Sequence, residues 1–541
     1  MNPETFFQTI RQKIKPSWAT LLISVFLFGL LAHAYAFFNY IPNWDSVISY
    51  YSDQNTIHLG RCFLTLACGI SSYYDLSWVN GLLSLAYIAV TAILISELLQ
   101  IRKKSMLILL GALLVTFPAV TSTFGYLYTA DGYMLAMLCT TLAIYLTFRH
   151  RFGFLPGALL LMFGLGCYQA YITFAAMLVI VYSLDKLLHQ DTPLSSLAWK
   201  WLRALVCAVI GYALYAVVSR LLLSAQHTTL ADYQGVSAIN GGGLGGGFAP
   251  LTAAKQCLID FVYFFTGPLH RMNFYSFLNL CLLALLVCGA LARIVRKKLW
   301  RSPARLCCIL LLAMLIPFVC YAIYFLTPDV SYHMLMQGSM YFVYALLLVL
   351  YDRAVFDAAD KLRRAAESVP SDSSRVMPAS AATNKNRMHH GIVWQWLCVI
   401  VCSLIVYNFI LVANICYRTQ ETSVSRSMNE IARLADIILS NPALQECGSI
   451  AVIGTRDEND AISLNLPPDM TGFSDGYIMT HALHYSLLLD RYHNLSFTPA
   501  DNEALEALAE NAIVRSMPCY PEEGSVQAIS GTLVIKLSDE S

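Results

Sequence analysis

Long apolar runs recur between residues 18 and 416, and they constrain the fold more than any other feature of the sequence. A helix needs about 20 residues, at about 1.5 Å per residue, to cross the hydrocarbon core of a bilayer. Only 13% of the 541 residues are charged, whereas a soluble domain carries about 25%. The sequence therefore predicts a polytopic all-α membrane protein. Its eleven predicted spans are 18–38, 78–100, 105–121, 131–148, 154–168, 171–187, 200–224, 273–293, 304–326, 336–352 and 393–416.

The distribution of basic residues orients these spans. With the N-terminus inside, the inner segments hold about 24 Lys and Arg residues, and the outer loops before residue 417 hold about four. The count of inner and outer basic residues depends on whether 154–168 and 171–187 are two spans. A single bent helix there would reverse all later spans and put the RIVRKK cluster outside. We therefore predict two separate spans in an inner-membrane protein with a cytoplasmic N-terminus and an extracytoplasmic C-terminus.

The predicted chain has four parts. Residues 1–352 form a transmembrane region of about ten spans, and 353–392 form a disordered cytoplasmic linker rich in Ala, Ser and charge. After the last span, 393–416, the segment 417–541 combines a helical pattern with the β-rich runs SIAVIGT and GTLVIKL, which predicts a small extracytoplasmic α/β domain. The glycine-rich stretch 239–250 follows no strand, so we expect a flexible outer loop rather than a phosphate-binding loop.

The 16 cysteines do not indicate a metal site. Most lie in apolar runs, where they act as small hydrophobic residues, and no CxxC pair stands among histidines at zinc spacing. Cys447 and Cys519 are alone in the C-terminal domain, outside the membrane, so we expect a disulfide between them. The alternative is two unpaired buried thiols. The net charge of +1 gives no argument for a nucleic-acid partner.

The first outer loop, 39–77, is the richest in ionisable residues at an outer span boundary. It carries the candidate catalytic residues Asp45 and Asp53, followed by Arg61. A carboxylate in this place can take a proton from an acceptor hydroxyl, and a cation can hold an anionic leaving group. Alternatively, the loop is solvated and Asp45 caps a short helix after Trp44.

Five further candidates lie near outer span ends, where ionisable groups are costly and often functional. Asp131 stands at the mouth of a span and either binds substrate or caps the helix. Tyr168 and Gln169 in GCYQAY either bind a ligand or anchor the chain at the interface. Arg271 and His333 suit a lipid phosphate, or each alone is a snorkelling side chain.

The chain resembles the bacterial membrane glucosyltransferases that decorate O-antigen, the serotype-converting type-II family. The first outer loop, WDSVISYYSDQNTIHLGRCF, leads to a Gly-Arg pair, and a Phe-Pro pair closes the third span in TFPAVTSTFGY. A Tyr-Gln pair interrupts an apolar region in GCYQAY, and the last span is followed by an α/β tail with SIAVIGT. The resemblance covers most of the chain in layout.

This resemblance implies a glycosyltransferase of the multi-span GT-C type. Such enzymes move a sugar, usually glucose, from a polyprenyl-phosphate donor to a cell-surface polysaccharide on the periplasmic side of the membrane. The resemblance places the catalytic acid at Asp45. Some relatives have a second acid where this chain has Ser46, which leaves open whether Asp53 supplies it. Cys62 departs from the large aromatic residue or proline that usually follows the Gly-Arg pair.

The resulting hypothesis has Asp45 as general base and Asp53 positioning the acceptor or the sugar. Arg61, Arg271 and His333 hold the lipid phosphate, and neither a nucleotide nor a metal cofactor is required. A flippase or transporter of lipid-linked sugars is the alternative, but it predicts inverted repeats and charges at the bilayer midplane, which the sequence does not show clearly. A polysaccharide polymerase or ligase would share the lipid-linked substrate but gives no reason for the acid-rich first loop.

Overall fold

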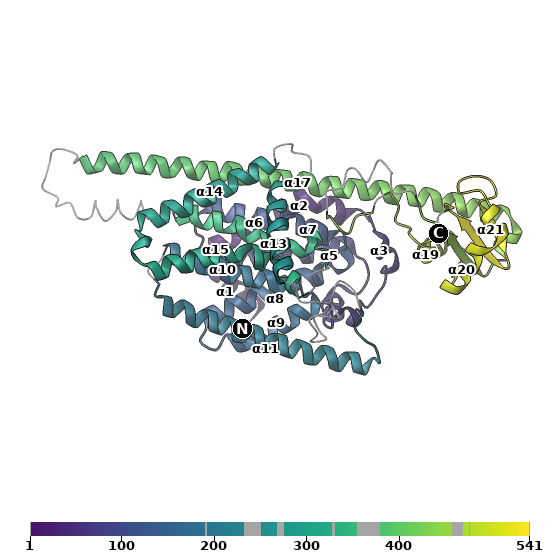
Figure 1. Ribbon diagram of the computed structural model, residues 1–541, viewed down its shortest axis with the longest axis horizontal. Coiled ribbons are helices and arrows are strands. Elements are labelled where there is room, and N and C mark those ends of the chain that lie inside the picture. The colour runs from purple at the N-terminus through teal and green to yellow at the C-terminus, as the bar shows by residue number, and fades with distance from the viewer. Residues whose placement is uncertain are drawn as a thin grey trace.

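The computed structural model is a helical bundle with a small α/β domain beyond one of its ends (Figure 1). The structure describes residues 2–189, 192–231, 250–267, 275–326, 330–353, 379–456, 469–474 and 476–539. Within this part, nine helices are long and apolar enough to cross a membrane. They are α2 (Pro16–Phe38), α5 (Ser77–Leu99), α8 (Leu127–Arg149), α10 (Tyr171–His189), α11 (Leu194–Ala225), α14 (Tyr275–Arg296), α15 (Pro303–Cys320), the segment Met334–Arg353, and Ile392–Ser440 within α17 (Ala379–Ser440).

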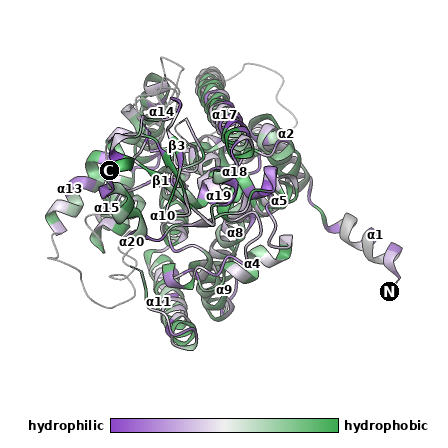
Figure 2. Ribbon diagram, turned by 90° about the vertical axis from the view of Figure 1, so that its right-hand side faces the viewer, coloured by the Kyte–Doolittle hydropathy of each residue, from purple (hydrophilic) through white to green (hydrophobic). Residues whose placement is uncertain are grey.

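Large apolar side chains remain exposed around the bundle, which is the surface that a bilayer requires. Leu221 on α11 is 64% exposed and Met314 on α15 is 70% exposed. Figure 2 looks along the bundle from the side of the α/β domain and shows hydrophobic residues on the helices all around its perimeter. The amphipathic helix α1 (Pro3–Lys13) precedes the first span. The chain is a multi-pass membrane protein, as the sequence predicts.

The predicted span 105–121 is broken rather than straight. It consists of α6 (Lys104–Thr116) and α7 (Pro118–Phe124), which meet at an angle of 42°. Proline lacks an N–H and disfavours the helical conformation in the residue before it. Phe117 accordingly has extended backbone angles, φ −56° and ψ 137°. The Phe-Pro pair therefore gives α7 a new direction, and α7 leads into the turn at Gly125 and Tyr126.

The region 154–187 forms two antiparallel helices, as the charge argument predicts. α9 (Phe154–Cys167) begins beside Leu146 near the end of α8, and Gly164 near its own end packs against Thr140. α10 then returns, so that the ring of Tyr182 packs at a tilt against that of Phe148, with 4.8 Å between ring centroids. The beginning of α9 and the last part of α10 thus both lie beside the C-terminal end of α8.

Basic side chains join the helices at the end of the bundle away from the α/β domain, which we call the basic end. Arg353 forms an ion pair with the buried Asp185 at 2.8 Å. Lys186 donates to the side chain of Gln100 at 3.4 Å, and Lys297 donates to the carbonyl of His189 at 2.6 Å. The opposite end, next to the domain, is the domain end.

Helix α17 continues from the last span into the α/β domain without a break. The sequence predicts a disordered linker up to residue 392 and a domain boundary at 417, but the chain is already helical from Ala379 to Ser440. The helical pattern before SIAVIGT is the end of this same helix. The first part of the predicted linker, 354–378, lies outside the described residues, as do the glycine-rich stretch 239–249 and Arg271.

The α/β domain contains a four-stranded sheet of order β2-β1-β4-β3. β1 (Ser449–Ile453) is parallel to β2 (Thr498–Pro499) and β4 (Thr532–Lys536), and β3 (Val526–Ile529) is antiparallel to β4. β1 and β4 are the two strands that the sequence predicts. The remaining helices of the domain are α18 (Pro442–Gln445), α19 (Ala482–His493), α20 (Asn502–Glu510) and α21 (Ala512–Ser516).

The end of α17 covers one face of this sheet. Leu434 and Ile438 repeat at helical spacing and pack with Ile450 and Leu533 in one core, while Val534 turns to the other face. The sheet is therefore covered on both faces. Because α17 continues from the last span, its packing against one face fixes the position of the sheet relative to the bundle.

The predicted disulfide between Cys447 and Cys519 is wrong, because both thiols are free. Cys447 precedes Gly448, whose N–H donates to Gly531 just before β4, whereas the N–H of Tyr520 donates to Lys536 at the end of β4. The two cysteines thus lie at opposite ends of a strand about 13 Å long, at about 3.3 Å per residue. A disulfide needs Cα atoms within about 7 Å.

Alkylation tests this separation directly. We expect the protein, purified without reductant and denatured in the presence of iodoacetamide, to carry the label on both Cys447 and Cys519 in peptide mass spectrometry. Recovery of a peptide pair linked through these two residues would contradict the fold of the domain.

Candidate active site

A cavity of 540 Å³ at the domain end collects most of the residues that the sequence singles out. We call it the Arg61 cavity. Helix α3 (Trp44–Ile48), the loop after it, the α9–α10 turn and the residues around η5 (Met334–Met340) all contribute to its wall. The predicted residues that line it are Asp45, Asp53, Arg61, Tyr168, Gln169 and His333.

Asp45 does not cap helix α3, so the alternative interpretation of this residue is wrong. The N-cap of α3 is Asn43, whose Oδ1 accepts from the N–H of Ser46 at 2.8 Å. Asp45 is the second residue of the helix, half-buried, with its carboxyl group in the cavity. Burial raises the pKa of Asp45, although the charges of Arg61 and His481 lower it. A carboxylate of raised pKa is a better proton acceptor than an ordinary aspartate.

The loop that follows α3 turns back through two further helices, η1 (Ile57–Leu59) and α4 (Leu64–Cys68). Asp53 is exposed at the cavity wall, and its Oδ1 accepts from the N–H of Asn55 at 3.1 Å. Gly60 has φ +73°, a left-handed conformation that glycine adopts without strain. This turn directs Arg61 into the cavity.

Two tyrosine rings hold the guanidinium group of Arg61. Its Cζ atom lies 5.7 Å from the ring centroid of Tyr133 and 5.5 Å from that of Tyr168, and its Nη1 donates to the Tyr133 hydroxyl at 2.8 Å. Contacts of this kind stabilise a cation that is partly removed from water. The cavity therefore contains a fixed positive charge near the carboxyl group of Asp45.

The side chain of Gln169 stabilises the turn at Gly60 and Arg61 through hydrogen bonds. Its Nε2 donates to the carbonyl of Leu59 at 3.1 Å and to the hydroxyl of Tyr215 at 3.2 Å, and Tyr215 donates to the carbonyl of Gly60 at 2.9 Å. The Tyr-Gln pair thus positions the turn that carries Arg61. An interface anchor alone would not make these bonds.

Asp131 does not reach the cavity, which corrects its prediction as a substrate-binding residue. Its side chain is fully buried, and one oxygen accepts from the amide of Asn80 at 3.1 Å. It is not a helix cap either, since α8 already begins at Leu127. The true start of α8 puts Asp131 more than one turn inside the helix, where it joins α8 to α5.

The α/β domain supplies a part of the site that the sequence did not reveal, the segment 469–474. The carbonyl of Asp469 accepts from the N–H of Met334 at 2.9 Å, next to His333. The carbonyl of Thr471 accepts from the hydroxyl of Ser122 at 2.8 Å, and Thr471 lines the Arg61 cavity. The only sequence signal is a glycine in MTGF, because Gly472 has φ +90° and touches the backbone of Gly125.

His333 is half-buried at the edge of the cavity, and burial lowers its pKa, although the nearby Asp469 raises it. This shift favours a neutral imidazole near neutral pH. As a neutral group, His333 can offer a lipid phosphate a hydrogen bond, and the role that the sequence predicts for it stays a prediction. The other predicted cation, Arg271, lies outside the described residues.

A family model described as "Glucosyl transferase GtrII" matches residues 34–351. The chain belongs to this family. The matched range includes Asp45, Arg61 and every other residue that lines the Arg61 cavity except Thr471, which belongs to the segment 469–474 beyond the match. Neither a curated protein nor a solved structure matches the chain.

The domain of this GtrII protein also packs directly on the helix that carries Asp45. Arg491 of α19 donates to the carbonyl of Val47 at 3.1 Å, and its guanidinium lies 4.3 Å from the ring centroid of Tyr50. These contacts cover the C-terminal half of α3. Arg491 is therefore a positioning residue for Asp45.

We expect Arg491→Ala to lower kcat by on the order of tenfold or more with little change in KM, because small displacements of a catalytic group have large effects. Arg491→Lys should recover part of the loss, since it can still donate to Val47. The control is Arg515→Ala, an exposed arginine of the same domain. Wild-type kcat in a normally folded Arg491→Ala protein would show that α3 does not depend on this contact.

Proposed function

We propose that this GtrII protein transfers glucose from a polyprenyl-phosphate donor to a hydroxyl group of a cell-surface glycan such as O-antigen, with the GT-C type of active site. The observation that carries the proposal is the pairing of Asp45 with Arg61 across one cavity at the domain end of a membrane bundle. A base and a cation in one site are what transfer from a phosphate-linked sugar requires.

The Arg61 cavity suits the head of such a donor. The guanidinium of Arg61 matches the geometry of a phosphate, and the rings of Tyr133 and Tyr168 that hold it exclude water from one side of the charge. The attraction between a cation and a phosphate is weak in water and becomes stronger where water is partly excluded. Arg61 would stabilise the negative charge that grows on the departing polyprenyl phosphate.

Asp45 is the proposed general base. Its carboxylate takes the proton of the acceptor hydroxyl, the freed oxygen attacks C1 of glucose, and the bond from C1 to the phosphate oxygen breaks with its electron pair leaving on polyprenyl phosphate. Asp53, exposed at the cavity wall, is proposed to position the acceptor or the sugar. His333 would contribute a hydrogen bond to either substrate. This reaction calls for no nucleotide.

The proposed location is the bacterial inner membrane with the domain end outside. The basic end carries Arg353, which pairs with Asp185, and Lys297, which donates to the carbonyl of His189. Because cytoplasmic loops are rich in Lys and Arg, these residues support a cytoplasmic position for that end. The Arg61 cavity then faces the periplasm, where glycan acceptors are displayed and nucleotide sugars are absent. This is why a lipid-linked donor is the better substrate.

Asp45→Asn tests the base. We expect the variant to insert and fold normally but to transfer glucose about 10²–10⁴ times more slowly, because that is the usual contribution of a positioned general base. The matched control is Asp490→Asn, which directly precedes Arg491 in α19 and does not line the cavity. Undiminished transfer by Asp45→Asn would remove Asp45 from the mechanism.

The pH dependence offers a second test of the same residue. The base must be ionised, so kcat/KM should fall as the pH drops through the raised pKa of Asp45, at a higher pH than for an ordinary aspartate of about 3.9. Because the charge of His481 lowers this pKa, His481→Gln should move the acid limb to higher pH. His493→Gln, at the far end of α19, is the control. A limb that stays in place or moves to lower pH would contradict the assignment.

A further inference from the structure

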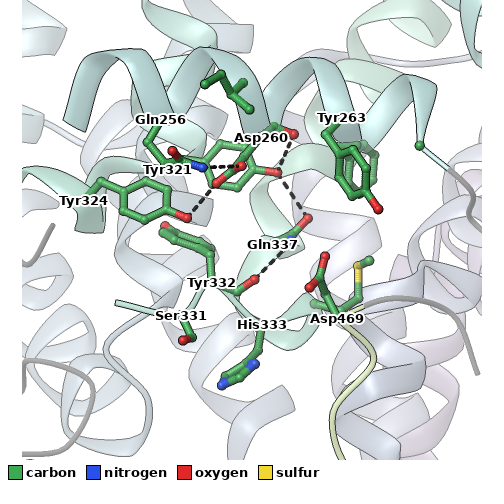
Figure 3. A pocket seen from close by; sticks show the side chains of 14 residues that line it. Gln256, Asp260, Tyr263, Tyr321, Tyr324, Ser331, Tyr332, His333, Gln337 and Asp469 are labelled. Carbon is green, nitrogen blue, oxygen red and sulfur yellow. Dashed lines mark hydrogen bonds between the residues drawn. The ribbon is translucent and has the colours of Figure 1, made fainter. Parts of the chain in front are cut away.

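A second cavity, of 620 Å³, lies beside the Arg61 cavity and plays no part in the reaction described so far. We call it the tyrosine cavity. Helix α13 (Pro250–Thr266), where the sequence predicts only an outer loop, forms one wall, and the short helix η4 (Ala322–Phe325) forms another. His333 and Asp469 line this cavity (Figure 3), and His333 also lines the Arg61 cavity, together with Thr471. His333 and the segment 469–474 therefore lie between the two cavities.

A carboxylate is held in place at the centre of one wall. Asp260 accepts a hydrogen bond from the Nε2 of Gln256 at 2.8 Å and from the hydroxyl of Tyr324 at 2.6 Å, one bond to each of its oxygens (Figure 3). Gln256 and Asp260 are four residues apart and therefore share one face of α13. The residue types and spacing on α13 thus build a polar wall that faces the cavity.

Tyrosine and glutamine side chains extend this network. The hydroxyl of Tyr321 lies 3.2 Å from the Oε1 of Gln337 and 3.3 Å from the carbonyl of Asp260, and Gln337 donates to the carbonyl of Tyr332 at 3.3 Å. Tyr321, Tyr324 and Tyr332 are all buried. Their rings are packed against one another, with 4.8 Å between the centroids of Tyr321 and Tyr332. The cavity wall is therefore preorganised.

The cavity is also accessible from outside the protein. Tyr263 lines it and is 46% exposed, and it lies at the cavity edge in Figure 3. The opposite face of α13 carries exposed apolar residues, including Leu251 at 85% and Val262 at 57%, which suit contact with lipid. A ligand can thus reach the cavity at the margin of the membrane.

The charge of the lining distinguishes the two cavities. Asp260 and Asp469 both present carboxyl groups to the tyrosine cavity, and burial together with the charge of Asp260 raises the pKa of Asp469. The described residues that line the tyrosine cavity include no Lys or Arg to bind a phosphate, whereas the Arg61 cavity supplies Arg61 beside its own carboxyl groups, Asp45 and Asp53. Carboxylate oxygens and amides accept or donate to neighbouring hydroxyl groups, and tyrosine rings cover the apolar faces of a sugar. The volume falls within the range of about 300–1,000 Å³ of small-ligand sites.

We propose that the tyrosine cavity binds uncharged sugar units of the acceptor glycan, with Asp260 and Tyr324 as specificity-determining residues. The assignment of these sugars to the acceptor rests on the proposed function. A glycan seated here directs a hydroxyl past His333 towards Asp45, while the donor occupies the Arg61 cavity. The two substrates thus enter through two cavities, of which only the donor's contains an arginine, and meet at His333, which lines both.

Two-substrate kinetics of the full chain in lipid nanodiscs test this division. The donor is polyprenyl-phosphate glucose, and the acceptor is the neutral oligosaccharide released from the surface polysaccharide of the strain that carries the gene. We expect Asp260→Asn and Tyr324→Phe each to raise the KM for the acceptor about tenfold or more and to leave the KM for the donor within about twofold, as the loss of a hydrogen bond to a charged group predicts. Thr266→Ala should change neither value, because Thr266 is exposed and its hydroxyl donates to the carbonyl of Val262 in the same helix.

Direct binding separates a failure of this inference from a failure of the proposed function. Saturation-transfer NMR with the same oligosaccharide, without donor, should show binding to the wild-type chain and weakened binding to both variants, even if no glucose is transferred. Normal transfer with an unchanged acceptor KM in both variants would overturn the inference alone. A rise in the donor KM, or weaker competition by polyprenyl phosphate in Asp260→Asn, would overturn it too, because the cavity would then hold the donor.

Discussion

The side chain of Asn43 joins the three parts of the molecule that meet at the candidate site. It is fully buried, its Oδ1 caps α3, and its Nδ2 donates to the carbonyls of Gly125 at 2.9 Å and Gly472 at 3.2 Å. One amide thus connects the helix that carries Asp45, the turn between α7 and α8, and the segment of the domain that separates the two cavities. A buried amide left without partners would be costly, so these elements are held together as a unit. The domain is for this reason a structural part of the site.

The sequence predicted the features that depend on local pattern. Span positions follow from the thickness of the bilayer, and the reversal between α9 and α10 follows from the basic residues at 293–298, because a bent helix would have moved them across the membrane. The gathering of Asp45, Arg61 and Gln169 was predicted from their common position at span ends and from the family resemblance. These inferences needed no knowledge of contacts between distant residues.

The sequence could not reveal features that depend on tertiary contact. Segment 469–474 reaches Ser122 through backbone carbonyls, which every residue possesses, and Asp131 is buried only because α8 begins earlier than its polar residues suggest. The predicted disulfide failed because two cysteines in one domain need not share one end of a strand. The sequence did not indicate helix α13, because Lys255 and Asp260 make this segment less apolar than the predicted spans. Asp260 nevertheless lines the tyrosine cavity.

Transfer of glucose from a lipid-linked donor by this GtrII protein can be followed in one assay. Membrane vesicles containing the protein receive polyprenyl phosphate carrying labelled glucose, together with the acceptor polysaccharide. We expect the label to appear in the polysaccharide and polyprenyl phosphate to be released. Movement of the intact labelled lipid across the bilayer without transfer, as for a flippase, would contradict it.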